Sequence, residues 1–370
     1  MGSPRVIISG GGTGGHVFPA IAIADAIKAA RPEAELLFVG AKGRLEMERV
    51  PAAGYPIEGL WISGFQRNLS RRNLSFPFKL ISSLYRSAAI IRKFKPQAAV
   101  GVGGYASGPL LRMATGKKIP SLIQEQNSFP GITNRLLASR VQRICVAYEG
   151  MERWFPKEKI AFTGNPVRQQ LLESGKRKQE AAVHFGLDPT APCLLAIGGS
   201  QGARSINRGM EAAIPGLLEK GVQVIWQCGK SYVDEGAYAK SEMRGLKRQA
   251  FIERMDYAYA MADVVVSRAG AMSVSELCLL GKPSIFVPSP NVAEDHQTRN
   301  AQALVEKEAA LLVADRDCEA QLGISIHKLL EDEGLRATMS RNIQSLARPD
   351  AARHIAEEVL KLIEKPKSAS

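Results

Sequence analysis

Several classes of protein are excluded by what this sequence has little of. Aromatic residues make up only 6% of its 370 residues, and no recognised nucleic-acid-binding motif is present. No apolar run approaches the ~20 residues of a membrane-spanning helix, and the first one, VIIS, is too short for a signal peptide. The five cysteines form no CxxC pair, which favours free thiols over a structural metal. We therefore expect a cytoplasmic globular protein.

Acidic residues are absent from one long stretch. No Asp or Glu lies between Glu58 and Glu125, whereas Lys and Arg recur throughout that stretch, and the whole chain carries a net charge of +13. Such a charge suits nucleic acid, an anionic membrane surface or a phosphorylated substrate. Because nucleic acid has no support beyond the charge, we expect one of the other two, and no nucleic-acid partner.

The chain alternates short apolar runs with amphipathic stretches, which predicts parallel strands buried under helices in an α/β fold. Its length favours two domains, and its halves begin alike. Each opens with an apolar strand, a glycine-rich turn and a helix, at residues 5–30 and 193–219. We predict two Rossmann-like domains, at residues 1–165 and 166–345, followed by a C-terminal segment at 346–370 whose helix covers about 351–365.

Glycines cluster after three predicted strands, in GGGTGG (10–15), GVGGYASGP (101–109) and GGSQGA (198–203). The first cluster fits the dinucleotide pattern GxGxxG, but the next strand ends in Gly40, Ala41 and Lys42 and lacks the acid that binds ribose. The chain has no P-loop either. Its one candidate, Gly229-Lys230-Ser231, has Val224 at the position where the P-loop pattern requires its first glycine. Two interpretations remain: tight turns with a purely structural role, or helix N-termini that bind phosphate.

The motifs taken in order resemble those of one family. GGTGGHVFPA, GVGGYASGP, EQNSFPGITN, GNPVR, GGSQGAR, SRAGAMSVSE and HQTRNA are similar to the successive motifs of the MurG family, the N-acetylglucosaminyltransferases that convert lipid I to lipid II in bacterial peptidoglycan synthesis. The resemblance covers residues 5 to about 345. It implies the GT-B architecture, in which two Rossmann-like domains with parallel sheets face each other across a cleft. The C-terminal domain would bind UDP-GlcNAc, the N-terminal one the acceptor and the membrane, and the last helix would return to the N-terminal domain.

His16 follows the first glycine turn at the start of a predicted helix. An ordinary imidazole pKa near 6.5 suits a general base. The resemblance implies that His16 removes the proton from the C4 hydroxyl of the muramoyl sugar, which then attacks GlcNAc with inversion and expels UDP. Binding of acceptor phosphate and capping of the helix are the alternatives.

The resemblance also implies residues that contact the two substrates. The acceptor diphosphate would meet Gly103, Gly104 and Tyr105. Ile252 would contact uracil through its backbone, Glu276 the ribose hydroxyls and Gln297 the GlcNAc hydroxyls. The full set of implied donor contacts is Thr13, Gly14, Gly15, Asn127, Arg168, Ser200, Ile252, Ala271, Met272, Ser273, Val274, Ser275, Glu276 and Gln297.

We expect no metal and no cofactor. The chain contains one Asp-x-Asp triplet, Asp315-Arg316-Asp317, but it precedes a predicted helix that Asp317 can cap. We therefore expect the leaving diphosphate to be stabilised by Ser200 and the amides of Gly199 to Gly202. The sequence departs from the family pattern at Gln124, where histidine is usual, and at His296, a position often occupied by glutamine.

The implied acceptor is a lipid, so the protein has to reach the cytoplasmic face of the bacterial plasma membrane. In the helix predicted from Phe76, Leu80, Ile81, Leu84, Ala88 and Ile91 share one face, opposite Lys79, Ser83, Arg86 and Lys93. One interpretation is a helix packed on the sheet with a solvated basic face. The other is peripheral binding to the anionic leaflet through Phe76, Phe78, Lys79, Arg67, Arg71 and Arg72.

The resemblance implies four kinds of partner: UDP-GlcNAc, lipid I, the anionic cytoplasmic leaflet and other cell-wall synthesis proteins. The alternative function is another UDP-sugar enzyme of the same architecture, such as a UDP-GlcNAc 2-epimerase.

Overall fold

The computed structural model describes residues 3–63, 75–167, 169–199, 201–236, 238, 243–292 and 295–364. The chain forms two compact units. Unit 1 comprises residues 1–168 together with 348–370, and unit 2 comprises residues 169–347. Unit 2 is therefore continuous in sequence, whereas unit 1 is built from both ends of the chain.

Unit 1 contains a parallel sheet of seven strands in the order β3-β2-β1-β4-β5-β6-β7. The order reverses direction between β1 and β4, which lie side by side with Val6 opposite Ala98. The strands are β1 (Arg5–Ser9), β2 (Glu35–Ala41), β3 (Ile57–Leu60), β4 (Ala98–Gly101), β5 (Ser121–Glu125), β6 (Arg143–Val146) and β7 (Ile160–Phe162). Every residue of β4 and β5 is buried, as expected for central strands covered on both faces.

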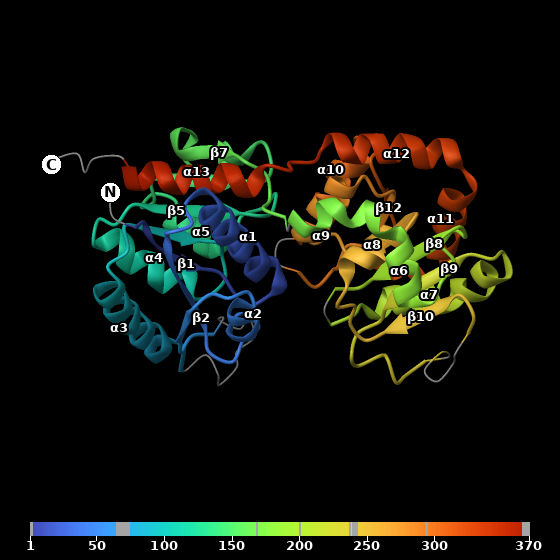
Figure 1. Ribbon diagram of the computed structural model, residues 1–370, viewed down its shortest axis with the longest axis horizontal. Helices are drawn as coiled ribbons and strands as arrows, with labels where there is room; N and C mark the ends of the chain where they lie inside the picture. The colour runs from blue at the N-terminus through green and yellow to red at the C-terminus, as the bar shows by residue number, and fades with distance from the viewer. Residues whose placement is uncertain are drawn as a thin grey trace. The chain divides into compact units, whose positions relative to one another are not determined.

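The helices of unit 1 are α1 (Gly14–Ala30), α2 (Glu46–Ala52), α3 (Phe76–Phe94), α4 (Ser107–Gly116), α5 (Ile132–Leu137) and α13 (Ala351–Glu364). Figure 1 shows α13, in red, beside α1, in blue, although more than 300 residues separate them in sequence. Ile355, Ala356 and Val359 of α13 complete a buried cluster with α1, β1 and β4. The C-terminal helix is thus part of the core of unit 1.

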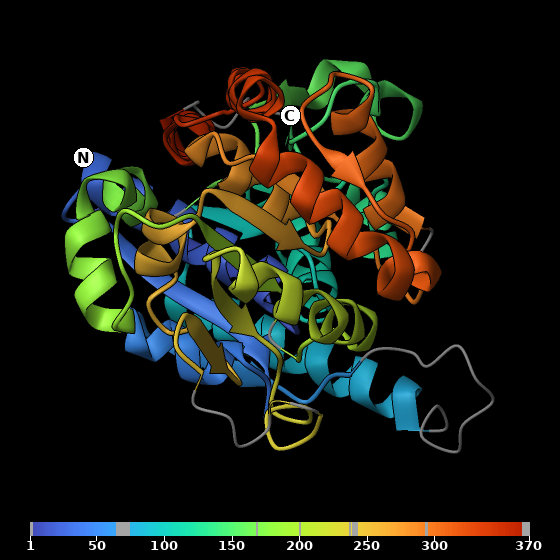
Figure 2. The same cartoon turned by 90° about the vertical axis from the view of Figure 1, so that its right-hand side faces the viewer.

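Unit 2 repeats the same strand order in a parallel sheet of six strands, β10-β9-β8-β11-β12-β13. The strands are β8 (Cys193–Ile197), β9 (Gln223–Gln227), β10 (Leu246–Gln249), β11 (Val264–Ser267), β12 (Ser284–Phe286) and β13 (Leu311–Leu312). The helices are α6 (Lys178–Phe185), α7 (Arg204–Glu219), α8 (Met255–Met261), α9 (Ala271–Leu280), α10 (His296–Val305), α11 (Cys318–Glu331) and α12 (Glu333–Ser345). Figure 2 shows α7 and α11 of this unit side by side.

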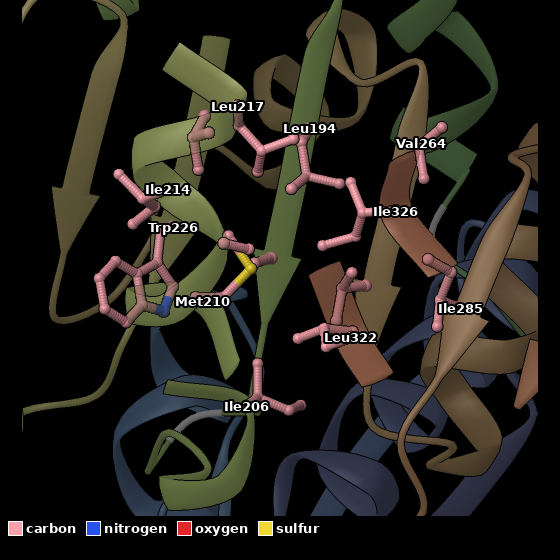
Figure 3. Close-up of a cluster of buried hydrophobic side chains, with 14 of the residues drawn as sticks. Leu194, Ile206, Met210, Ile214, Leu217, Trp226, Val264, Ile285, Leu322 and Ile326 are labelled. Carbon is pink, nitrogen blue, oxygen red and sulfur yellow. The ribbon is translucent and has the colours of Figure 1, made fainter. Parts of the chain in front are cut away.

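The core of unit 2 lies between that sheet and the helices α7 and α11. Figure 3 shows Met210 and Ile214 of α7 and Leu322 and Ile326 of α11 packed with Leu194 of β8. All five side chains are fully buried. Apolar residues three and four apart along each helix therefore meet the sheet along one face.

The fold confirms the predicted class of two Rossmann-like domains with parallel sheets. The prediction missed β3, β7 and β10, which are edge strands. The predicted apolar and polar faces of α3 were partly wrong. Ser83, expected on the polar face, is fully buried, and its hydroxyl donates to the carbonyl of Trp61. Ile81, expected on the apolar face that packs inward, is 53% exposed.

The five cysteines, all within the described ranges, are free and buried. Within those ranges no helix has the length and apolar character to cross a bilayer.

Candidate functional site

The predicted site residues of unit 1 gather where β1 and β4 end. This is the point at which the strand order reverses, and open α/β sheets bind ligands there, outside the carboxyl ends of the strands. The first glycine loop follows β1 and leads into α1, and Gly103 and Gly104 follow β4 and lead into α4. The sequence therefore places its two glycine clusters of unit 1 on neighbouring strands of one sheet edge.

Contacts within the chain explain several of these glycines. A Cβ at Gly10 would lie 2.9 Å from the carbonyl oxygen of His16, and one at Gly11 would collide with the carboxylate of Glu46. Gly12 differs, because its φ is +89° and no atom of the described residues lies within 4 Å of its absent Cβ. The structural role that the sequence left open thus accounts for Gly10 and Gly11, whereas a Cβ at Gly12 would meet no described atom.

His16 lies in the first turn of α1, which Thr13 begins as the N-cap residue. The His16 Nδ1 lies 3.4 Å from the hydroxyl oxygen of Thr13. The imidazole also lies against Gly103, where a Cβ would come within 2.6 Å of the His16 Cδ2 and 2.8 Å of its Nε2. His16 is half-buried, so its ring is held between two glycine clusters while part of its surface stays accessible.

The second cluster adopts a backbone that only glycine accepts readily. Gly103 has φ +96° and Gly104 has φ +86°, and a Cβ at Gly104 would collide with the carbonyl of Gly11. Tyr105 follows with 49% of its surface exposed. The two clusters are therefore in direct backbone contact, and Tyr105 is the accessible side chain next to them.

Asn127 stands after β5, the next strand along the sheet. Its amide N–H and its side-chain Nδ2 both donate to Oε1 of Glu125, at 3.0 and 3.3 Å. Glu125 also accepts from the amide of Gly131 at 3.1 Å and from Asn134 at 2.8 Å. Burial raises the pKa of Glu125 above its ordinary value, although these hydrogen bonds act in the opposite direction. Glu125, which the sequence interpretation did not single out, fixes the loop that carries Asn127.

The two departures from the family pattern differ in setting. Gln124 is fully buried and donates to Oδ1 of Asn165 at 3.0 Å, and it accepts a hydrogen bond from Gln126. Gln126 in turn donates to the carbonyl of Val102 at 2.7 Å. The amide at position 124 therefore belongs to a buried network that supports the loop after β4. His296 is the first residue of α10.

The glycine turn of unit 2 occupies the equivalent place, after β8 and beside β11. A Cβ at Gly198 would collide with the amide of Ala203, whereas Gly199 has φ +83° and no described atom within 4 Å of its absent Cβ. The amide of Gly202 donates to the carbonyl of Gly199 at 2.9 Å. The Gly202 amide, which we expect to help cradle phosphate, is therefore hydrogen-bonded within the turn itself. Ser200 and Arg168 lie outside the described residues.

Helix α9 begins beside this turn, after β11. Ala271 and Val274 are buried, so their side chains face the core, whereas Met272, Ser273, Ser275 and Glu276 are half-buried. The Ser275 hydroxyl donates to the carbonyl of Ala271 at 2.9 Å. The carboxylate of Glu276 accepts from the hydroxyl of Tyr259 at 2.9 Å, which orients it.

Ile252 and Gln297 come from other strand ends of the same sheet edge. The amide N–H of Ile252 donates to Oε1 of Gln227 at 2.9 Å, and Nε2 of Gln227 donates to the carbonyl of Gly199 at 2.9 Å. Gln227 is 4% exposed, so a buried side chain joins the glycine turn to Ile252. Gln297 accepts from the amide of Ser289 at 2.9 Å.

The Asp-x-Asp triplet is engaged in contacts within unit 2. Asp315 accepts from Nη1 of Arg268 and from the hydroxyl of Ser205, each at 2.5 Å. Asp317 occupies the N-cap position of α11, as expected, but its side chain caps no amide within the described residues. Among those residues no three His, Cys, Asp or Glu side chains lie together as a metal would require.

Glu46 and Gln227 are two further residues that the sequence interpretation missed. Each is polar, wholly or almost wholly buried and hydrogen-bonded to a glycine turn. Neither belongs to a glycine motif. The one signal for Glu46 was the isolated Gly40, where a Cβ would lie 2.5 Å from Cγ of Glu46.

The doubled sheet order and the glycine turns at both points of reversal are those of the GT-B class, which has two Rossmann-like domains with parallel sheets. Residues 6–146 match the model of the glycosyltransferase family 28 N-terminal domain, and residues 193–355 match that of its C-terminal domain. The chain belongs to glycosyltransferase family 28 and, within it, to the MurG family, as its relatives show.

Two of those relatives are UDP-N-acetylglucosamine–N-acetylmuramyl-(pentapeptide) pyrophosphoryl-undecaprenol N-acetylglucosamine transferases. The protein of Parabacteroides distasonis is 53% identical over 98% of this chain and 99% of its own length. That of Phocaeicola vulgatus is 54% identical over 98% of this chain and 97% of its own length.

Two solved structures have similar folds. The crystal structure of Acinetobacter baumannii MurG matches with a TM-score of 0.74 and 26% identity, over 97% of this chain and 99% of that one. The UDP-GlcNAc 2-epimerase of Neisseria meningitidis matches with a TM-score of 0.70 over 97% of this chain and 100% of that one. At 14% identity the epimerase shows the shared fold alone.

Proposed function

We propose that this enzyme transfers GlcNAc from UDP-GlcNAc to the C4 hydroxyl of the MurNAc-pentapeptide of lipid I, which gives lipid II. The observation that carries the proposal is the 53% identity, over 98% of this chain, to a transferase named for that reaction. The position of His16 at the reversal point of the first sheet supports it.

His16 is the proposed general base. Its imidazole takes the proton of the C4 hydroxyl while that oxygen bonds to the anomeric carbon of GlcNAc. The bond from that carbon to the diphosphate breaks at the same time, so its electron pair leaves with UDP and the configuration inverts. General base catalysis of this kind is typically worth ~10²- to 10⁴-fold in rate. The contact with Gly103 supports the role, because it limits where the ring can lie.

Unit 2 is the proposed donor-binding domain. The Gly199 turn and the N-terminus of α9 supply amides and helix dipoles for the diphosphate, and Glu276 accepts hydrogen bonds from the ribose hydroxyls. Since the Ile252 amide is bonded to Gln227, the carbonyl of Ile252 is the group we assign to uracil N3–H. The remaining proposed donor contacts are Arg168, Ser200, Ala271 to Ser275 and Gln297.

Unit 1 is the proposed acceptor domain. Gly103, Gly104 and Tyr105 meet the diphosphate of lipid I, and Thr13, Gly14, Gly15 and Asn127 contact the donor. We further propose that transfer needs no divalent cation. This is supported by the engagement of Asp315 with Arg268 and Ser205, which occupies the carboxylate that a metal would require.

The test is a transfer assay with UDP-GlcNAc and a lipid I analogue in excess EDTA, with His16→Ala beside the wild type. We expect the disaccharide product from the wild type and a loss of at least 10²-fold in kcat for the variant. His354→Ala, at an exposed site, is the matched control. Failure of the wild type to form product with or without Mg²⁺ would refute the function, and formation of UDP-ManNAc without acceptor would favour the epimerase.

We also propose that unit 1 binds the anionic cytoplasmic leaflet of the bacterial plasma membrane through α3 and the residues before it. Phe78 is 71% exposed and Tyr85 is 77% exposed, and Trp61 and Ile81 are each 53% exposed. Lys79 lies over the ring of Trp61 at 5.8 Å. Arg67, Arg71 and Arg72, which we expect at the same surface, lie outside the described residues. Other cell-wall synthesis proteins are further proposed partners.

Flotation with anionic vesicles tests the membrane surface. Phe78→Glu with Tyr85→Glu should abolish most flotation, because it replaces exposed apolar side chains with charges that anionic lipid repels. Replacing Arg71, Arg72 and Lys79 with Glu should do the same. Val183→Glu is the control, since Val183 is 84% exposed on α6 of unit 2. Unchanged flotation of both test variants would refute the proposal.

A further inference from the structure

Glu46 is a wholly buried acidic residue at the start of α2 that the mechanism above does not use. Its side chain has no exposed surface. Oε2 accepts from the amide of Gly12 at 2.9 Å, and Oε1 accepts from the amide of Ala41 at 2.9 Å. One carboxylate thus joins the first glycine loop to the end of β2.

Burial of this carboxylate is offset by backbone groups. Among the described residues no Lys, Arg or His forms an ion pair with Glu46. Its oxygens instead face two amides, and it is the first residue of α2, where the helix dipole favours negative charge. The Gly12 amide belongs to the loop just before α1, and the Ala41 amide to the end of β2. The first glycine loop therefore already holds an anion that belongs to the chain.

Three successive contacts connect the Glu46 carboxylate to the ring of His16. The carboxylate lies against Gly11, the carbonyl of Gly11 lies against Gly104, and the ring of His16 lies against the neighbouring Gly103. Each contact needs a glycine, because a Cβ would collide or come within 3 Å at every one of them. A shift of the Glu46 carboxylate would therefore move the first loop relative to the second, and His16 with it.

We propose that Glu46 is a positioning residue, which sets the first glycine loop against the second and thereby places the His16 imidazole for catalysis. The proposal rests on the proposed function. It gives the loop a role different from the one its glycines suggest: the Gly12 amide binds an internal carboxylate and not a substrate phosphate. Its effect should therefore appear in the chemical step and not in the affinity for UDP-GlcNAc.

Glu46→Gln is the main variant. It keeps the size of the side chain but turns an NH₂ group toward one of the two amides, so two donors face each other. Glu46→Asp keeps both acceptor oxygens on a shorter stem. We expect kcat to fall at least 10-fold in Glu46→Gln and by less in Glu46→Asp. In both variants KM for UDP-GlcNAc and Kd for UDP should change less than threefold. Glu48→Gln, exposed on the same helix, is the matched control.

A double-mutant cycle isolates the contact. Gly11→Ala places a Cβ on the carboxylate and should lower kcat as Glu46→Gln does. Because both variants disturb one contact, the double variant should be no slower than about the worse single one. Gly116→Ala controls for loss of glycine, since no described atom lies within 4 Å of its absent Cβ.

The outcomes are distinct. A wild type without transfer activity refutes the proposed function itself. With an active wild type, unchanged kcat in Glu46→Gln, or multiplicative effects in the cycle, overturns the role of Glu46. A fall in kcat that only matches the unfolded fraction measured by circular dichroism also overturns it. If Glu46→Gln does not fold, Glu46→Asp and Gly11→Ala decide by the same criteria.

Discussion

At the scale of single residues, the site of unit 1 depends on glycines, because a residue with a side chain would not fit at those positions. His16 can lie against Gly103 because that residue has no Cβ, and the Gly103 backbone has φ +96°. A glycine is therefore required there both for space and for backbone conformation.

Gly103→Ala should reduce transfer by at least 10²-fold. The added Cβ would lie 2.6 Å from the His16 Cδ2, so the ring must leave its place. UDP affinity, measured by calorimetry, should stay unchanged. Gly108→Ala in the same motif is the control, because its Cβ would lie at an ordinary 3.6 Å from Thr133. Wild-type kcat in Gly103→Ala would contradict the role of this contact.

Gln227→Ala should raise KM for UDP-GlcNAc about 10-fold, with a smaller effect on kcat. The substitution removes two buried hydrogen bonds, each worth about 1 kcal/mol, that hold Gly199 and Ile252. Gln223→Ala on the same strand is the control, since Gln223 bonds Asp188 at the opposite end of β9. Equal effects of the two variants on KM would contradict a specific role for Gln227.

The residues that sequence reasoning found and missed differ in a physical way. His16 and the turns could be predicted because glycine clusters after apolar strands mark sharp backbone at a sheet edge. Glu46 could not, because a glutamate at the start of a helix is usually solvated, and the glycine loop that it meets through the Gly12 amide lies 34 residues before it. Such contacts leave no pattern in the residues around Glu46.

At the scale of elements, α13 is attached to unit 1 by both packing and charge. Glu358 accepts from Nε of Arg143 on β6 at 2.5 Å and from Lys361 at 2.9 Å. Burial opposes ionisation of Glu358, but these partners outweigh it and hold its pKa below the ordinary value. Its contribution to stability is therefore present above the ordinary glutamate pKa and is lost as pH falls through the lowered one.

Glu358→Gln should weaken the docking of α13 by about 1–2 kcal/mol at pH 7, because the pair with Arg143 is only partly exposed. Hydrogen exchange of α13 amides measures the change. The difference from wild type should disappear at pH values below the lowered pKa of Glu358. Glu357→Gln, in a more exposed pair with Arg353, should weaken the docking less than Glu358→Gln does. A difference that persists in acid would contradict the assignment.

The predicted elements were most accurate in the sheet centres. Continuous apolar runs such as CLLAI become β8, buried on both faces. The strands missed lie at edges, where one side has no partner strand, and β10 has the polar sequence LKRQ. In α3 Ser83 and Ser87 are buried together with Ile90 and Ile91, so the buried face of this helix includes small polar residues as well as large apolar ones.

At the scale of the whole molecule, the reactivity of the buried cysteines measures how far each unit is folded. Cys145 belongs to unit 1, and Cys193, Cys228, Cys278 and Cys318 belong to unit 2. Burial raises the pKa of Cys145 and of Cys193 to about 12. At pH 8 the folded protein should therefore react only slowly with a thiol reagent.

UDP should slow the labelling of the four cysteines of unit 2 during partial unfolding in urea, because a ligand stabilises the unit that binds it. Labelling of Cys145 should change little. Mass spectrometry of labelled peptides measures both, and the same buffer without UDP is the reference. Equal protection of all five cysteines would contradict the assignment of UDP binding to unit 2.

The split composition of unit 1 has a consequence for synthesis on the ribosome. Unit 2, residues 169–347, emerges as one uninterrupted piece and can complete its core at once. Unit 1 has to wait, because Ile355, Ala356 and Val359 fill its interior and are translated only after the whole of unit 2. Until they arrive, the nascent chain carries an apolar groove over α1, so a ribosome stalled near residue 347 should recruit chaperones to the earlier half of the polypeptide.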